Sequence, residues 1–448
     1  MKTLTIKKGY AFNIAGPPAA DVVERPSPPR IAVIPHHLRF AKPRLKVAVG
    51  DPVNCGSVLF EDKRNPEVKF LSPGGGDIIE INHGPRRTVT EIVIRLDEDE
   101  ASETFESLSE ADLERIHRDH LIQMIIRGGL WWLIRQLPFR DYAKPSSRPA
   151  FTLVTLGGKE PFRPLPEIYL NGKTDLFAFG LKLLEKLTGK APLVCAPGDG
   201  DAIVRTLPEH ITHVVNGKYP AHDPGTILYT LKTDPSHANA WYIDGQDLLL
   251  LAELVRTGKF PTRRIIAVGG NSTPLPGHYL SRLGVPFSYL VDPGKVSANT
   301  RYVSGGILTG YTGSPGGYMG LFETSLVLIP EGNTTEFLAL FNPGLKKPTY
   351  SRSYLSRINP KPLIFDCNRH GGDRACIACM HCADVCPVNI LPEFAYKAVL
   401  AGEVEEYLAH GLLDCVECGL CSYVCPSKIE LTHTFMRAKA DYVKAQDK

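Results

Sequence analysis

The sequence predicts a multi-domain protein of α/β and β type that ends in a helical, cysteine-rich domain. Three observations support this fold class. The 448 residues exceed what one hydrophobic core usually holds. The patterns change along the chain from short β-rich runs to alternating strands and helices, and then to Gly-rich β runs. Eight of the eleven cysteines fall between Cys376 and Cys425.

Composition excludes several classes of protein. Lys and Arg number 51 against 48 Asp and Glu, so the net charge of +3 argues against a chain that coats nucleic acid or an anionic bilayer. With 43% hydrophobic and 22% charged residues, the chain is typical of globular proteins. We find no secretory signal and no run of about 20 apolar residues, so we expect no transmembrane helix. Clustered cysteines are then better interpreted as metal ligands than as disulfides.

Residues 1–100 contain short β-rich runs separated by turn residues such as Gly50-Asp51 and Gly74-Gly75-Gly76. Two segments, VAVGDPVNCGSVL and FLSPGGGDIIEINHG, look like two halves of one unit. That pattern resembles the barrel-sandwich hybrid fold of lipoyl and biotinyl domains, and we predict such a domain here. The expected strands cover residues 31–34, 45–49, 57–60, 68–71, 78–81 and 90–94.

Residues 101–257 are predicted to form a Rossmann-like α/β domain. An acidic connector over 97–119 leads into an amphipathic helix that we expect to run through Arg135 and to close at Leu137-Pro138. From Phe151 to Thr257 strand and helix patterns alternate, as in a parallel sheet covered by helices.

Residues 258–342 are again β-rich and heavy in Gly, with segments such as RIIAVGGN and VSGGILTG. They favour a small mixed β domain of β-grasp (SLBB-like) type. The stretch 343–362 is interpreted as a linker. Residues 360–448 are predicted to be helical, with the clustered cysteines embedded among the helices.

One cysteine motif occurs twice in this last domain, as CIACMHCADVCP and again as CVECGLCSYVCP. In each copy three cysteines at i, i+3 and i+6 are followed by a fourth cysteine and a proline. Soft thiolates at this spacing suit [4Fe-4S] clusters, with the fourth cysteine ligating the other cluster. We therefore predict that the ligands of cluster I are Cys376, Cys379, Cys382 and Cys425. The predicted ligands of cluster II are Cys415, Cys418, Cys421 and Cys386.

Zinc is the alternative metal, but a tetrahedral zinc site needs only four ligands, commonly two Cys-x2-Cys pairs. Small residues in and near the motifs allow backbone amides to approach cluster sulfurs, and Ile377, Met380 and His381 are expected to pack around the clusters. We expect His381 not to be a ligand. The other three cysteines are interpreted as packing or bystander residues: Cys55, Cys195 and Cys367.

Much of the chain resembles a known family. TIKKGYAFNIAG, GLWWLIRQLPF and RYVSGGILTGYTG are similar to the NqrA subunit of the Na+-translocating NADH:quinone oxidoreductase, and the likeness runs to about residue 356. The better-known members lack the double cysteine motif. CIACMHCADVCPVNILP and HGLLDCVECGLCSYVCPSKIEL instead resemble the RnfC subunit of the Rnf complex, a ferredoxin:NAD+ oxidoreductase; RnfC carries two [4Fe-4S] clusters.

The resemblance bears on flavin and nicotinamide. RnfC and the flavin-binding subunit of complex I, which residues 101–257 resemble, cradle FMN and NADH phosphates with a Gly-rich loop. In residues 137–162 of this chain the only glycines are Gly157 and Gly158, and the pattern G-x-G-x-x-G does not occur. We therefore expect that this chain binds neither FMN nor NADH, although GGKEPF keeps the Glu-Pro pair of the cluster-bearing relatives.

The resemblance also implies quinone contacts at residues 34–41 and 130–139. His37, Trp131, Arg135 and Phe139 are the candidates, because a quinone needs an aromatic wall and polar partners for its carbonyls. The alternative is that Trp131 and Trp132 belong to the core and that Arg135 is a surface cation on its helix.

These interpretations predict a peripheral electron-transfer subunit of a membrane-bound, ion-translocating NADH:quinone or ferredoxin:NAD+ oxidoreductase. Expected partners are the membrane subunits and a soluble electron donor or acceptor subunit, and no nucleic acid. The expected location is the cytoplasmic side of the bacterial inner membrane. Two alternatives stay open: an NADH-oxidising flavin dehydrogenase subunit, and a docking subunit with structural clusters.

Overall fold

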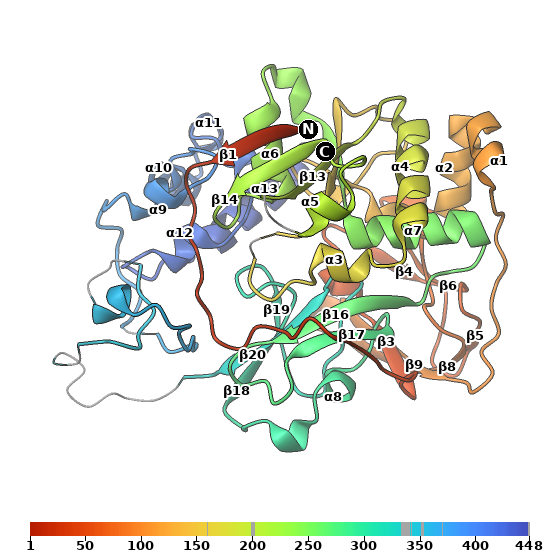
Figure 1. Ribbon diagram of the computed structural model, residues 1–448, viewed down its shortest axis with the longest axis horizontal. Coiled ribbons are helices and arrows are strands. Elements are labelled where there is room, and N and C mark those ends of the chain that lie inside the picture. The colour runs from red at the N-terminus through yellow and green to blue at the C-terminus, as the bar shows by residue number, and fades with distance from the viewer. Residues whose placement is uncertain are drawn as a thin grey trace.

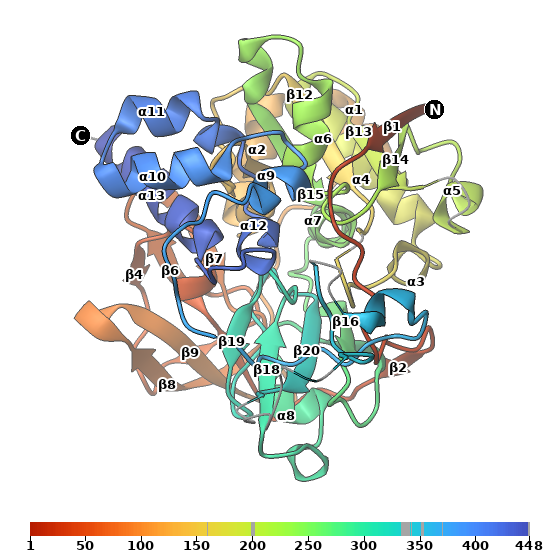
Figure 2. The ribbon, with the colours of Figure 1, turned by 90° about the vertical axis from the view of Figure 1, so that its left-hand side faces the viewer.

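The computed structural model describes residues 1–158, 160–198, 202–332, 341, 343–350, 354–369 and 371–446. Figure 1 shows the cysteine-rich helices, in blue, on the left flank of the molecule. The α/β region lies above and beside the two β-rich regions in this view. Figure 2 shows the same helices from the front, with helix α12 (Leu420–Tyr423) next to the β sheet that residues 263–330 contribute.

Two small antiparallel sheets form the first β region. Their strands fall close to the predicted ones, and Phe60 stacks on Phe70 in the core with 4.6 Å between ring centroids. One sheet orders its strands β3-β9-β8-β5 and the other β4-β6-β7. The strands are β3 (Arg30–Val33), β4 (Pro43–Leu45), β5 (Pro52–Val53), β6 (Val58–Asp62), β7 (Asn65–Leu71), β8 (Gly76–His83) and β9 (Val89–Leu96).

The α/β region contains the alternating parallel strands that the sequence predicts. Strands β14, β13, β12 and β15 are adjacent and parallel in one seven-stranded sheet. Helices α4 and α7 pack closely on each other, since Gly180 lies against Leu248 and Ala252. These elements are β12 (Phe151–Thr155), α3 (Pro166–Tyr169), α4 (Thr174–Thr188), β13 (Leu193–Pro197), α5 (Ala202–Thr206), β14 (His213–Gly217), α6 (Pro224–Leu231), β15 (Ala240–Asp244) and α7 (Gly245–Thr257).

The first residues of the chain differ from the prediction that placed them with residues 1–100. Strand β1 (Lys2–Ile6) runs parallel to β14 and forms the edge of the seven-stranded sheet. Strand β2 (Val22–Glu24) pairs in parallel with β17 (Gly277–Arg282) of the small β sheet. Both partners lie far along the sequence, so no local pattern could indicate these pairings.

The prediction of a helix that runs through Arg135 is wrong. Helix α1 (Glu110–Arg115) begins with a capping box at Ser109, and α2 (Arg118–Arg127) ends before two glycines. At the second of these, Gly129, φ is +69° and a Cβ would lie 2.2 Å from Leu71. A short 3-10 turn at Trp131–Leu133 follows, and then the hairpin of β10 (Arg135–Gln136) and β11 (Asp141–Tyr142).

The small β region forms a mixed six-stranded sheet in which β16 pairs antiparallel with β17 and parallel with β20. Two short helical turns lie between its strands. The end of the predicted domain, residues 333–340 and 342, lies outside the described residues. The elements are β16 (Arg263–Gly269), β17 (Gly277–Arg282), α8 (Phe287–Leu290), β18 (Thr300–Ser304), β19 (Tyr311–Gly313) and β20 (Ser325–Pro330).

The C-terminal region is helical, as predicted. Phe435 is fully buried at the centre of its apolar core. Across the described part of the chain, no helix combines the length and the apolar character needed to cross a membrane. The helices are α9 (His381–Val385), α10 (Pro392–Ala401), α11 (Val404–Ala409), α12 (Leu420–Tyr423) and α13 (Leu431–Gln446).

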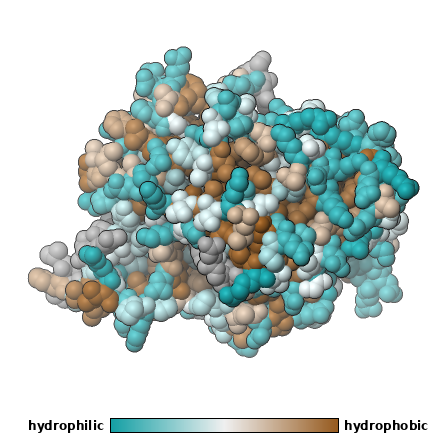
Figure 3. Space-filling model, turned by 45° about the horizontal axis from the view of Figure 1, so that its top comes forward, coloured by the Kyte–Doolittle hydropathy of each residue, from teal (hydrophilic) through white to brown (hydrophobic). Residues whose placement is uncertain are grey.

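Exposed apolar side chains also mark this helical region. Leu391 precedes α10, and Phe394 and Leu400 lie on that helix; all three are exposed, as is Val404 at the start of α11. Figure 3 shows one face of the molecule on which hydrophobic and hydrophilic side chains alternate in small patches.

Candidate metal centre

The four cysteines predicted for cluster I line one hollow of about 360 Å³. Cys382 is buried, whereas Cys376, Cys379 and Cys425 are partly exposed. Ile377 and Met380 also line this hollow, as the sequence suggested. The remaining lining residues are Glu393, Pro426, Ser427, Ile429 and Leu431.

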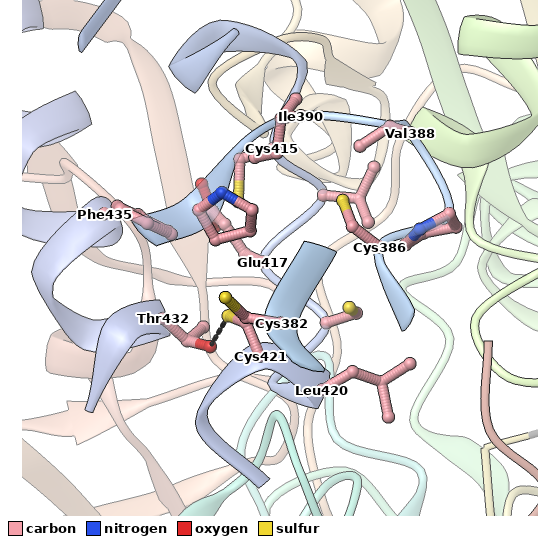
Figure 4. Close-up of a pocket in the computed structure, with 14 residues that line it drawn as sticks. Cys382, Cys386, Val388, Ile390, Cys415, Glu417, Leu420, Cys421, Thr432 and Phe435 are labelled. Carbon is pink, nitrogen blue, oxygen red and sulfur yellow. Dashed lines mark hydrogen bonds between the residues drawn. The ribbon is translucent and has the colours of Figure 1, made fainter. Parts of the chain in front are cut away.

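The four cysteines predicted for cluster II line a second hollow, of about 340 Å³, which Figure 4 shows in close-up. Cys386 comes from the end of α9, and the other three come from the loop and helix of the second motif. Val388, Ile390 and Phe435 supply apolar walls, and Cys382 also reaches this hollow. Glu417 and Thr432 are the polar side chains of the lining.

The cysteines therefore gather in the two predicted sets, and Cys382 borders both hollows. Among the described residues, no three His, Cys, Asp or Glu side chains converge closely enough to hold a single metal ion. A [4Fe-4S] cubane places its four thiolates on four separate irons, so its ligands surround a volume and need not converge on one point. The donor set fits such clusters, while the ligand set of each cluster stays a prediction.

The two motifs share one backbone pattern. The residue before the second cysteine has a positive φ in both copies, 52° at Ala378 and 56° at Glu417, and so does the residue after it, 64° at Met380 and 79° at Gly419. Met380 and Gly419 then cap the short helices α9 and α12, which carry the third cysteine of each motif. Left-handed backbone at matching positions turns the chain around each site in the same way.

Burial dominates the electrostatics of these thiols. It raises the pKa of Cys415 to about 12, partly offset by the nearby Lys439. It raises the pKa of Cys421 to about 11, partly offset by the hydroxyl of Thr432, whose oxygen lies 3.3 Å from Sγ. Burial also raises the pKa of Cys386 and Cys418. Neutral thiols are thus favoured without metal, and a bound metal must supply the charge that stabilises thiolates.

A buried carboxyl accompanies the cysteines predicted for cluster I. The Sγ of Cys382 lies 3.4 Å from Oε2 of Glu393, the second residue of α10, and Oε1 of Glu393 has no hydrogen-bond partner among the described residues. Burial raises the pKa of Cys382, and Glu393 raises it further.

A network of charges, in which Lys439 and Glu417 are buried and Arg39 is half-buried, surrounds the loop of the second motif. Lys439 of α13 places Nζ 2.6 Å from the carbonyl oxygen of Cys415 and 3.3 Å from Oε1 of Glu417. Arg39 of the first β region donates to both carboxylate oxygens of Glu417. Burial raises the pKa of Glu417, but Lys439 and Arg39 outweigh it and hold that pKa at about 2.

The α/β region contacts the same loop. Arg140 donates to the carbonyl oxygen of Val416 at 3.0 Å and to Asp223, the N-cap residue of α6, at 2.7 Å. Tyr219 donates to the carbonyl oxygen of Cys418 at 2.7 Å. Three parts of the chain therefore hold the loop of the second motif in place.

The remaining cysteines lie outside both hollows. Burial raises the pKa of Cys55 to about 11 and that of Cys195 to about 12, as expected of small buried residues. Cys367 is partly buried beside the core of the small β sheet. His381 is not among the residues that line the two hollows, and its ring lies 5.3 Å from that of Tyr350.

The candidate quinone residues occupy different surroundings. Trp131 is 1% exposed and donates to the carbonyl oxygen of Ala143, so it belongs to the core. Arg135 is not a surface cation on a helix: it lies over the rings of Tyr242 and Phe322 and 3.7 Å from Asp247. Phe139 stacks on Tyr442 of α13.

His37 lies in a polar setting. Its Nδ1 is 3.2 Å from Oε1 of Glu323, whose side chain is also buried, and its ring stacks on Tyr311 at 3.7 Å. The neighbouring residue Phe322 contacts both Arg135 and Trp132. The structure thus gathers His37, Arg135 and Trp132 around Phe322-Glu323, while Phe139 lies apart from them, against α13.

Sequence reasoning missed Glu417, Lys439 and Glu393. A sequence pattern could have indicated Lys439. Leu431, Phe435 and Ala438 recur at helical spacing and form an apolar face, and Lys439, eight residues after Leu431, lies on that same face. Glu417 occupies the position at which the first motif has Ala378. A charged residue inside a metal-binding motif is the pattern that could have indicated it.

Comparison with known proteins agrees with this architecture. Residues 4–97 match the NqrA N-terminal barrel-sandwich hybrid domain, residues 116–260 the NqrA second alpha/beta domain, and residues 375–429 a 4Fe-4S dicluster domain. The NqrA subunit of the Na(+)-translocating NADH-quinone reductase from Shewanella amazonensis is 30% identical over 99% of this chain and 100% of its own. The chain belongs to the NqrA family.

Other members of the NqrA family are equally similar. That of Vibrio vulnificus is 30% identical over 95% of this chain and 96% of its own. An NAD+-reducing [NiFe]-hydrogenase matches with 12% identity over 52% of each chain and a TM-score of 0.33, too low to inform the fold. The predicted membership of the NqrA family, the barrel-sandwich hybrid and the dicluster region are therefore confirmed.

Proposed function

We propose that this NqrA-family protein is a peripheral electron-transfer subunit of an ion-translocating oxidoreductase and carries two [4Fe-4S] clusters in series. The observation that carries the proposal is the pair of cysteine-lined hollows with Cys382 between them. Clusters bound there would supply one-electron redox chemistry. Neighbouring sites are what stepwise transfer of single electrons needs.

The residues of this chain hold and shield those clusters. Cys376, Cys379, Cys382 and Cys425 would hold cluster I, and Cys415, Cys418, Cys421 and Cys386 would hold cluster II. Thr432 stands within hydrogen-bond distance of Cys421 Sγ, and the apolar walls around both hollows limit water. Hydrogen bonds and burial are the means by which a protein adjusts cluster potentials.

The partners follow from the relatives, which are subunits of a Na+-translocating NADH-quinone reductase. We infer that this chain binds membrane subunits of an Nqr- or Rnf-like complex and a soluble electron donor or acceptor subunit. Its location would be the cytoplasmic side of the bacterial inner membrane. FMN and NADH would be bound by other subunits.

EPR during stepwise reduction tests the relay. Both clusters should be reduced within the range between nicotinamide and quinone potentials. Clusters that stay silent over this range would mean that they are structural and that the chain only docks other subunits.

A flavin-containing dehydrogenase gives a different result. Such a protein would be yellow as purified, and NADH alone would bleach it. We expect a brown protein without flavin absorbance that NADH alone does not reduce.

Quinone binding is a second candidate function, favoured by His37 and its surroundings. His37 and Arg39 lie on one short segment; His37 contacts Glu323, and Arg39 pairs with Glu417 beside cluster II. A quinone head-group near His37 would lie next to the cluster that could exchange electrons with it. A photoreactive quinone analogue should then label residues 34–41 of the purified chain, and unlabelled quinone should suppress the labelling.

A further inference from the structure

The two cluster sites differ in the charges around them. At cluster II the network contains three cations, Lys439, Arg39 and Arg140, and two carboxylates, Glu417 and Asp223, of which Lys439 and Glu417 are buried and the others half-buried. A further cation, Lys8, donates to the carbonyl oxygen of Ala383 at 2.9 Å, between the cluster I ligand Cys382 and the cluster II ligand Cys386.

Cluster I has a carboxyl group rather than a cation beside it. The charged side chain in contact with one of its cysteines is Glu393, whose carboxyl oxygen lies 3.4 Å from Cys382 Sγ. Because Glu393 is 3% exposed, bulk water provides little screening at this position.

Lys439 is the cation nearest to the cluster II backbone in this network. Its side chain is 0% exposed, and Nζ donates to the carbonyl oxygen of a cluster II cysteine, Cys415, as well as to Glu417. A third acceptor, the carbonyl oxygen of Pro138 at 3.4 Å, fixes the ammonium group from the side of the α/β region. A lysine held by three acceptors in the interior places a fixed positive charge beside the site.

We propose that Lys439 is a positioning residue that raises the reduction potential of cluster II above that of cluster I. An added electron makes a cluster more negative, so a fixed cation at short range in a poorly screened interior favours the reduced form. In the exchange between the two sites, cluster I is then oxidised by one electron and cluster II is reduced by one. The inference rests on the proposed function, since it requires both clusters to be redox-active.

The test is a redox titration followed by EPR, on the full-length chain with both clusters in place. A Cys376→Ser variant, which removes a cluster I ligand, assigns the two signals. We expect the wild-type potential of cluster II to be the higher one. Lys439→Met should lower it by at least a tenfold change in the reduction equilibrium, or about 59 mV for one electron, and should leave cluster I unchanged.

Two matched variants separate charge from packing. Lys439→Arg keeps the charge and should keep the potential, and Lys397→Met, which removes an exposed lysine from α10, should change neither cluster. The proposal is overturned if Lys439→Met leaves the cluster II potential unchanged or shifts the potentials of both clusters equally. It is also overturned if Lys439→Arg lowers the cluster II potential as much as Lys439→Met does.

If Lys439→Met does not retain its clusters, Glu417→Gln decides the question. Removing the negative charge that opposes Lys439 should raise the potential of cluster II, and an unchanged or lower value would contradict the proposal. If neither cluster of the wild-type protein can be reduced, the proposed relay itself is refuted.

Discussion

Lys439 Nζ and Glu417 Oε1 lie 3.3 Å apart, with side chains 0% and 6% exposed, and this ion pair joins the last helix to the cluster II loop. Because Arg39 pairs with the same carboxylate, the contact also ties the first β region to the metal centre. One buried carboxylate thus connects three segments that are remote in sequence.

Removing that carboxylate should loosen the metal centre. Glu417→Ala leaves Lys439 and Arg39 without their partner, and breaking a buried ion pair costs about 3–5 kcal/mol. We expect faster loss of iron in mild denaturant and an earlier unfolding midpoint, measured by iron release and circular dichroism. Glu405→Ala, at an exposed position of α11, is the control and should behave as the wild type.

Iron content tests the division of the cysteines. A Cys376/Cys379/Cys382→Ala triple variant should keep about four of about eight irons per chain, because the second cubane retains its own four thiolates. Iron and acid-labile sulfide assays provide the measurement. Cys195→Ala should keep the full complement, and eight irons in the triple variant would refute the ligand assignment.

Loading of the clusters should depend on pH. The pKa of Cys415, about 12, and that of Cys421, about 11, are raised above the ordinary thiol value, so both groups are protonated at neutral pH without metal. Metal binding must displace those protons, and apparent affinity should therefore increase as pH rises from about 6 to about 9. Proton release during anaerobic reconstitution, followed in weak buffer, checks the sign; an affinity that falls with pH would contradict it.

Quinone labelling should separate His37 from Trp131. His37→Phe removes the group beside Glu323 and should abolish labelling of residues 34–41, with iron content unchanged. Trp131→Ala should instead destabilise the protein by about 3–5 kcal/mol, because it deletes a large side chain from the core. Labelling that survives His37→Phe would remove this segment as a quinone site.

The local parts of the fold could be predicted from the sequence. Strands of the first β region and the α/β alternation follow from short-range patterns, and the cysteine spacing alone indicates the two sets that line the hollows. The predicted helix through Arg135 failed because Gly128-Gly129 ends α2 and Leu71 leaves room only for a glycine at position 129.

The rest depends on contacts that the sequence does not encode locally. Arg39, Glu417 and Lys439 are charged residues in three distant segments, and composition alone would place each at the surface. Only the packed structure shows that both cations pair with the one carboxylate. Trp131 illustrates the reverse case, since an aromatic residue suited to a ligand wall is used in the core.

The pairing of β1 with β14 has a consequence for how the chain folds during synthesis. Lys2 is opposite His213, so β1 is translated well before the strand with which it pairs. At about 5–20 residues per second, that interval lasts about 10–40 s. During this time the nascent strand has an unpaired edge. This edge of the sheet can form only after β14 has been translated, which makes the pairing of β1 a late step in assembly.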